Sequence, residues 1–94
     1  MRYLLIDDVR DFNCERTCRT VKEGIEALQE ESWDVLFLDH DMGLTESGMD
    51  VLIWLEANLR YLPKEIRVIT MNPVARPIME ERVRQLYNRR DNEL

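Results

Sequence analysis

Three short apolar runs are spaced along the chain and end at polar or turn-forming residues, and a more polar segment at residues 16–20 can form a further short strand. Apolar runs of this length between turn signals are typical of buried β-strands. The run at residues 34–38 leads directly into the acidic sequence Asp39-His40-Asp41, so this strand would deliver two carboxylates and an imidazole to its carboxyl end. We predict strands at residues 2–6, 16–20, 34–38 and 66–70.

The segments between these runs carry the start signals of helices. Thr20-Val21-Lys22-Glu23 has the spacing of a capping box and predicts a helix that extends to about Glu31. Ser47 is a favourable N-cap, and Asp50 in the following turn complements the helix dipole. This second helix is expected to end before Pro63, which cannot continue a helix.

The last helix has two candidate starting points. Asn72-Pro73 is an N-cap followed by a proline at the first helical position. A helix begun there would, however, lose a backbone hydrogen bond at Pro77. We therefore expect a single turn after Asn72, a main helix from near Pro77, and a frayed, solvated tail at residues 89–94.

The alternation of strands and helices predicts an α/β fold with a mainly parallel open sheet and right-handed crossovers. The connection between the first two strands, residues 7–15, is polar and too short for a packed helix. Parallel crossovers usually need a dozen or more residues. An antiparallel second strand therefore remains an alternative.

Length and composition bound the function. The 94 residues predict one domain, residues 1–94, and the 45% hydrophobic and 34% charged fractions indicate a folded globule. A net charge of −6 disfavours binding to duplex nucleic acid, which requires a basic surface. No apolar run approaches the ~18 residues of a membrane span, and we expect a cytoplasmic protein without membrane association.

Polar side chains follow three of the predicted strands. Asp7-Asp8 follows the first strand, Asp39-His40-Asp41 the third, and Thr70 and Asn72 the fourth. The carboxyl ends of parallel strands are where α/β sheets place their ligand sites. Carboxylates brought together repel one another, which raises their pKa values or recruits a cation.

An all-oxygen cluster suits a hard cation, and we predict Mg²⁺ or Mn²⁺ as the cofactor. A hard cation beside carboxylates commonly serves phosphate chemistry, because it neutralises charge on phosphoryl oxygens. The alternative is that these side chains only cap helices and satisfy loop amides. Convergence from three separate strand ends favours the cation site.

The spacing of these residues resembles the receiver domain of response regulators, in which paired acids and a central aspartate hold Mg²⁺. Asp7-Asp8, Asp39 and Thr70 occupy matching places, as does Met42. The resemblance implies that Asp7, Asp8 and Asp39 are metal ligands. A receiver also uses a phosphate-binding lysine, but neither Lys22 nor Lys64 lies at a suitable strand end, which disfavours a phosphoacceptor role for Asp39.

The chain is more similar to a compact receiver offshoot, the cyclic-phosphate-processing receiver-like family, with the pattern D-D-x-R, L-D-H-D-[LM]-G, G-x-D-V-L-x-W-L and N-P-V-x-R. The resemblance implies a minimal receiver-like, flavodoxin-like sheet of four strands in order 2-1-3-4 with three helices. The corresponding segments of this chain are Asp7-Asp8-Val9-Arg10, Leu38-Asp39-His40-Asp41-Met42-Gly43, Gly48-Met49-Asp50-Val51-Leu52-Ile53-Trp54-Leu55 and Asn72-Pro73-Val74-Ala75-Arg76.

Two functions compete on this basis. The first is an enzyme acting on a cyclic or otherwise phosphorylated nucleotide, with a metal-dependent phosphodiesterase or hydrolase activity. The second is a non-catalytic module that senses such a ligand or docks a partner protein. In either case we assign catalytic or central roles to Asp39, His40 and Asp41, and ligand contacts to Arg10, Thr70, Asn72 and Arg76.

A second apolar stripe on the predicted helix after Ser47 is a candidate partner surface. Met49, Ile53 and Ala57 recur at every fourth residue, away from the predicted core stripe. They predict a homodimer or a docked partner protein. The alternative is that they are scattered surface residues, which are normal in globular proteins.

Overall fold

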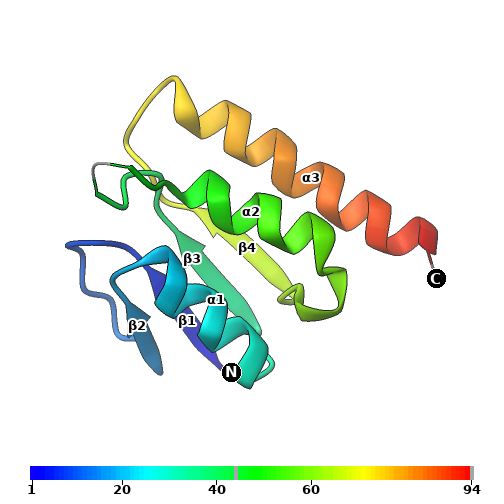
Figure 1. Cartoon of the computed structure of the whole chain (residues 1–94), viewed down its shortest axis with the longest axis horizontal. Helices are drawn as coiled ribbons and strands as arrows, with labels where there is room; N and C mark the ends of the chain where they lie inside the picture. Colours follow the sequence, from blue (N-terminus) through cyan, green and yellow to red (C-terminus); the bar gives the residue numbers. More distant parts are fainter. Residues whose placement is uncertain (44, 94) are drawn as a thin grey trace.

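The computed structural model describes residues 1–43 and 45–93. Strands and helices alternate along the chain after an initial pair of strands (Figure 1). The elements are β1 (Tyr3–Ile6), β2 (Arg16–Cys18), α1 (Val21–Glu30), β3 (Val35–Leu38), α2 (Gly48–Ala57), the 3₁₀ turn η1 (Leu59–Tyr61), β4 (Glu65–Val68) and α3 (Ala75–Glu93).

The four strands form one sheet in the order β2-β1-β3-β4, which confirms the predicted order. All three strand pairs are parallel, so the alternative of an antiparallel β2 is wrong. β2 has only three residues, so the chain must run back only about 10 Å between the end of β1 and the start of β2. Residues 7–15 can span about 30 Å when extended, so this loop makes a parallel crossover without a helix.

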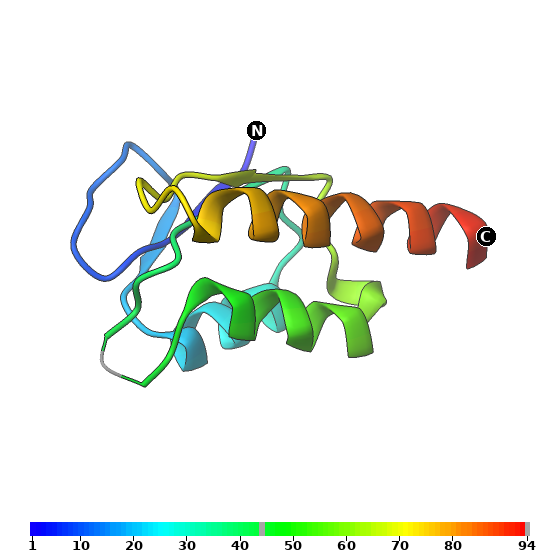
Figure 2. The same cartoon turned by 90° about the horizontal axis from the view of Figure 1, so that it is seen from above.

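One face of the sheet carries the hydrophobic core. Alternate strand residues point to this face, where side chains of all three helices cover them, and Figure 2 shows the helices on one side of the strands. The strand residues in this cluster are Leu4, Ile6, Cys18, Leu36, Leu38, Ile66 and Val68. The helices therefore hold three strand ends in a fixed relation to one another.

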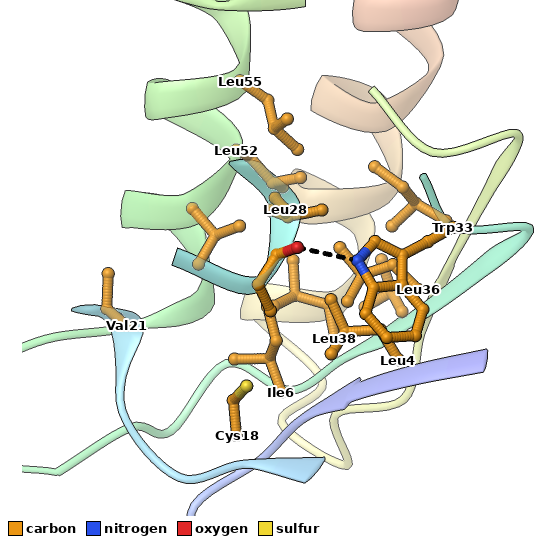
Figure 3. Close-up of a cluster of buried hydrophobic side chains, with 14 of the residues drawn as sticks. Leu4, Ile6, Cys18, Val21, Leu28, Trp33, Leu36, Leu38, Leu52 and Leu55 are labelled. Carbon is orange, nitrogen blue, oxygen red and sulfur yellow. Dashed lines mark hydrogen bonds between the residues drawn. The ribbon is translucent and has the colours of Figure 1, made fainter. Parts of the chain in front are cut away.

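Trp33 connects the start of β3 to the end of α1. Its indole Nε1 donates a hydrogen bond of 2.9 Å to the carbonyl of Ala27, as the dashed line in Figure 3 shows. A buried indole N–H needs such a partner. Around this bond, Leu28, Leu52 and Leu55 complete the packing between the helices and the sheet.

The opposite face of the sheet is covered by side chains and by the loop after β1. Phe37 of β3 makes edge contacts with the rings of Tyr3 and Phe12, at centroid distances of 5.9 and 5.4 Å. The guanidinium of Arg67 lies 5.7 Å from the centre of the Phe37 ring. Among the described elements, no helix belongs to this layer, so the domain has one sheet and one helical layer.

Capping side chains explain where the first two helices begin. Ser47 and Asp50 form a full capping box at the start of α2. At the start of α1, Thr20 Oγ1 accepts from the amide of Glu23, as predicted, while the Glu23 carboxylate meets the Thr20 hydroxyl instead of its backbone. Both helices therefore start at the residues that the sequence indicates.

The third helix starts earlier than predicted. Asn72 Oδ1 accepts from the amides of Val74 and Ala75, at 3.0 and 3.1 Å, and α3 is continuous from Ala75. The predicted single turn after Asn72 is present, because the amide of Arg76 donates to the carbonyl of Asn72 at 3.0 Å. The main helix begins at Ala75, two residues before Pro77, which has no N–H to donate to the carbonyl one turn earlier.

The segment predicted as a frayed tail is helical in the structure, because α3 continues to Glu93. Arg89 pairs with Glu93 one turn later and with Glu56 of α2, at 3.1 and 3.7 Å. These contacts extend the helix beyond its last buried residue, Leu86. Leu94 lies outside the described residues, and none of the described helices has the length and apolar character needed to cross a membrane.

The stripe predicted as a partner surface is divided between the core and the surface. Met49 packs against the core cluster, whereas Ile53 is 52% exposed and Ala57 is also exposed. Met49 is therefore not available to a partner in the way that the spacing indicates. The homodimer and the partner protein stay predictions.

Gly48 supports the site because α2 approaches β3 closely at this position. A Cβ atom there would lie 1.9 Å from the carbonyl oxygen of Asp39 and 2.9 Å from Cε of Met79. Gly48→Ala should therefore destabilise the protein by about 1–3 kcal/mol, although alanine normally favours a helix over glycine. Chemical denaturation measures this change.

Gly24→Ala is the matched comparison, since its Cβ would meet Cδ1 of Ile6 at 2.5 Å, which is the movable end of a side chain. The loss of stability should be smaller there than at Gly48, where a backbone carbonyl blocks the space. An unchanged or increased stability of Gly48→Ala would contradict the close approach.

Candidate metal centre

The carboxyl ends of β1, β3 and β4 lie side by side at one end of the sheet (Figure 1). Their last residues, Ile6, Leu38 and Val68, pair in register. The ladder continues one step further, because the amide of Asp39 donates to Ile6 and that of Ile69 donates to Leu38, both at 3.0 Å. The loops that follow the three strands therefore start from one row.

Asp7, Asp8 and Asp39 come together at this row. One carboxylate oxygen from each residue lies within 4.8 Å of the others. Oxygen ligands on opposite sides of one Mg²⁺ are about 4.2 Å apart, so small side-chain rotations bring all three onto one ion. The three carboxylates are therefore of the kind and close enough to contribute to one hard-cation site, and their role as ligands stays a prediction.

Asp7 is the most buried of the three, with no exposed surface. Its Oδ1 accepts from the amides of Val9 and Arg10, both at 2.9 Å, which fixes the loop after β1. Its Oδ2 has no hydrogen-bond partner among the described residues. Because a buried charged oxygen without a partner is costly, the site favours a positive ligand at this atom.

Asp39 is also buried, and its Oδ1 accepts from the amide of His40 at 2.8 Å. Burial raises the pKa of Asp39 above its ordinary value, and the carboxylates of Asp7 and Asp41 raise it further. The amide of His40 and the charge of Arg10 act in the opposite direction but do not cancel the rise. Asp39 is thus a carboxylate that gains from a nearby cation.

Arg10 supplies the positive charge nearest to these acids. Its Nη1 lies 3.5 Å from Oδ2 of Asp7 and 3.9 Å from Oδ1 of Asp39. The same nitrogen donates a hydrogen bond of 2.7 Å to the carbonyl of Ile69, in the loop after β4. Arg10, predicted as a phosphate contact, is therefore held between the carboxylates and the neighbouring loop.

Arg19 organises the loop after β1, and the sequence analysis did not identify it. Its Nη1 donates to the carbonyls of Asp7 and Arg10, and its Nη2 pairs with the carboxylate of Asp11. Arg19 follows β2, so it ties the loop to the neighbouring strand. The only signal in the sequence is a lone arginine after a strand, which does not by itself indicate such a role.

His40 and Asp41 form a pair beside the three carboxylates. Nδ1 of His40 lies 3.1 Å from Oδ1 of Asp41, whose side chain is 71% exposed. Asp41 is outside the group of three carboxylates that approach one another. The pair is open to solvent, where it is available to a ligand, and its catalytic role stays a prediction.

The loop after β4 and the first turn of α3 carry the other predicted ligand residues. Thr70 is buried and its Oγ1 accepts from the amide of Asn72 at 3.1 Å, while Asn72 caps α3. Arg76 donates to the carbonyl of Thr70 at 3.3 Å and pairs with Glu80 at 3.6 Å. Thr70 and Asn72 thus have structural roles that account for their side chains, and their contacts to a ligand stay predictions.

Neither lysine forms an ion pair with the acids in the described part of the chain. Lys64 pairs with Asp34 at 3.1 Å, and both residues precede strands, at the opposite end of the parallel sheet. Lys22 is exposed in the first turn of α1. Arg10 is therefore the cationic side chain that the described structure pairs with the carboxylates.

A four-stranded parallel sheet with three acids at its carboxyl end defines a receiver-like α/β domain. Comparison with protein families matches residues 2–85 to the cyclic-phosphate processing receiver domain. The chain belongs to this family. Comparisons with curated proteins and with solved structures give no match.

The raised pKa of Asp39 predicts a pH dependence of stability. The folded state holds a proton on Asp39 more tightly than the unfolded state, whose carboxyl has a pKa of about 3.9. This contribution to stability is thus present below that pKa and is lost as pH rises through the folded pKa. In metal-free buffer at neutral pH, Asp39→Asn should therefore raise the melting temperature by several degrees, since ~1 kcal/mol corresponds to about 4–8 °C in a domain of this size.

The control is Asp91→Asn, an exposed change near the end of α3 that should leave the melting temperature almost unaltered. The difference between Asp39→Asn and wild type should shrink as pH approaches 4. A variant that is less stable than wild type at neutral pH without metal would contradict the electrostatic account of Asp39.

Proposed function

We propose that this domain binds Mg²⁺ or Mn²⁺ through Asp7, Asp8 and Asp39 and uses the ion to hold the phosphate of a phosphorylated or cyclic nucleotide. The observation that carries the proposal is Oδ2 of Asp7, a fully buried carboxylate oxygen without a hydrogen-bond partner in the described structure. Helix caps and loop amides account for Oδ1 of Asp7 but not for Oδ2.

The charge of the site decides the order of binding. Three carboxylates repel a phosphate, so an anionic ligand enters only when a divalent cation has neutralised them. Arg10 lies on the loop after β1 and Arg76 in the first turn of α3, directly after the loop that follows β4, and arginine is well shaped for phosphate oxygens. The proposal is therefore metal-dependent phosphate binding.

The rim of the site favours a ligand that has an apolar part as well as a phosphate. Val9, Met71 and Val74 are all strongly exposed, and they lie on the loop that holds Arg10 and on the loop between β4 and α3. The loops adjoin, because Arg10 bonds to Ile69. A nucleobase would cover such side chains, which supports a nucleotide over inorganic phosphate as the ligand.

The same residues suit the hydrolysis of a cyclic phosphodiester, in which water attacks phosphorus while a ring oxygen leaves and takes up a proton. A bound divalent cation would neutralise the phosphoryl oxygens and lower the pKa of a water molecule. His40 is the residue suited to move the proton, because an imidazole can both accept and donate one and the Asp41 carboxylate, 3.1 Å from Nδ1, can orient the ring.

A second function, docking of a partner protein without turnover, is favoured by a separate observation. Phe12 lies on the helix-free side of the sheet and Ile53 on α2, and both are large apolar side chains that remain exposed. Neither belongs to the proposed metal site. A protein that binds neither metal nor nucleotide would leave docking as the surviving function.

The metal site is tested by calorimetric titration with Mg²⁺ and Mn²⁺. Asp39→Asn and Asp8→Asn should each weaken binding by at least about tenfold, because each removes a ligand oxygen with its charge. Asp41→Asn is the matched control, because Asp41 lies outside the group of three carboxylates. This variant should bind metal nearly as tightly as wild type. Equal affinities for wild type and Asp39→Asn would exclude the site.

The ligand is tested by incubating the protein with Mn²⁺ and a panel of 2′,3′- and 3′,5′-cyclic nucleotides and their linear products. We expect binding that requires the metal and is lost in Asp39→Asn. Chromatography for linear products then separates two outcomes. Turnover that disappears in both Asp39→Asn and His40→Ala would identify an enzyme, and binding without turnover would identify a sensor. Metal binding without any nucleotide binding would contradict the proposed ligand.

A further inference from the structure

We propose that Arg10 exchanges partners when ligands bind. In the metal-free protein it partly neutralises Asp7 and Asp39. Once a divalent cation binds these carboxylates, Arg10 binds the phosphate instead. The inference rests on the proposed metal site and adds an order of events and a regulator of metal affinity. It predicts that one residue opposes the metal and supports the phosphate ligand.

The first step concerns the metal-free state. Nη1 of Arg10 lies 3.5 Å from Oδ2 of Asp7 and 3.9 Å from Oδ1 of Asp39, distances that allow attraction between charges but exceed a hydrogen bond. The hydrogen bond of Nη1 goes instead to Ile69, at 2.7 Å. Arg10 thus neutralises the acids in part, while Oδ2 of Asp7 keeps its place open for a closer ligand.

The second step concerns the metal-bound state. An ion about 2.1 Å from Oδ2 of Asp7 would lie at most about 5.6 Å from Nη1 of Arg10, if the guanidinium stays in place. Two cations at that distance in a largely buried site repel strongly. The positive charge of Arg10 therefore weakens metal binding, and the ion in turn removes the attraction that holds Arg10 to the acids.

The third step concerns the phosphate. Guanidinium has five N–H donors, and in the described structure the Arg10 side chain makes one hydrogen bond, through Nη1. The side chain is 33% exposed, so its other donors are accessible to a ligand. When the metal neutralises the carboxylates, a phosphate oxygen becomes the remaining anion for Arg10 to bind.

These steps predict that Arg10→Gln lowers the stability of the metal-free protein, strengthens Mg²⁺ binding and weakens phosphate binding. Without metal, the variant should melt at a lower temperature than wild type, because Asp7 and Asp39 lose their counter-charge. In calorimetry, it should bind Mg²⁺ at least about tenfold more tightly, because the repelling charge is gone. With Mg²⁺ at saturation, it should bind AMP, used as the phosphate probe, at least about tenfold more weakly.

Two variants serve as controls. Arg82→Gln removes an arginine of similar exposure, 32% against 33%, with the same change in net charge, but Arg82 pairs with Glu56 away from the acids. It should leave affinities for Mg²⁺ and AMP unaltered. Arg10→Lys keeps the charge and should bind Mg²⁺ with nearly wild-type affinity, while it loses AMP affinity because lysine lacks the planar fork of donors.

The sign of the change in metal affinity decides the proposal. If Arg10 only anchored the loop through Ile69, its loss would weaken Mg²⁺ binding or leave it unaltered, and either result overturns the inference. The proposed metal site fails separately, when wild type itself binds no Mg²⁺. Should Arg10→Gln not fold, the wild-type protein gives the answer through the Nε–H resonance of Arg10, assigned with Arg10→Lys. Saturating Mg²⁺ should shift that resonance, and an unmoved resonance would overturn the proposal.

Discussion

The carboxylate of Asp7 is fully buried and only half satisfied, and the candidate site is built around it. Its Oδ1 holds two amides of the loop after β1, whereas its Oδ2 has no hydrogen-bond partner in the described part of the chain. A buried polar atom in that state costs about 1–3 kcal/mol, and more when it is charged. The free energy of unfolding of a small domain is only about 5–15 kcal/mol, so this destabilisation is a large fraction of the total. The proposed cation would remove this cost, and Arg10, 3.5 Å away, reduces it in the absence of metal.

The sheet and its single helical layer place the carboxylate of Asp7 beside those of Asp8 and Asp39. Three helices on one face of the sheet lock β1, β3 and β4 into register, so the residues after Ile6 and Leu38 meet at one edge. Gly48 lets α2 approach the backbone of Asp39. The opposite face is closed by the rings around Phe37 instead of by a second helical layer. The site is therefore supported mainly from the helical side.

The strands could be predicted because short apolar runs between turn signals are local patterns, whereas their order, which is confirmed, came from the family resemblance. The structure brings Asp7, Asp8 and Asp39 together as expected, and their role as metal ligands stays a prediction. The sequence placed the start of the main part of the last helix near Pro77, two residues after the observed start of α3 at Ala75. It also placed a frayed tail where Arg89 reaches Glu56 of another helix. The partners of Arg10 and the loop contacts of Arg19 involve distant segments, and no local pattern reports them.

The central claim is that a divalent cation binds Oδ2 of Asp7 together with Asp8 and Asp39. The most direct measurement is the anomalous diffraction signal of Mn²⁺ in a crystal grown with that ion. The account predicts one strong peak within ligand distance of all three carboxylates, with Arg10 withdrawn from Asp7. A map without a peak at these residues under saturating Mn²⁺, or with Arg10 still beside Asp7 and the metal bound elsewhere, would contradict it.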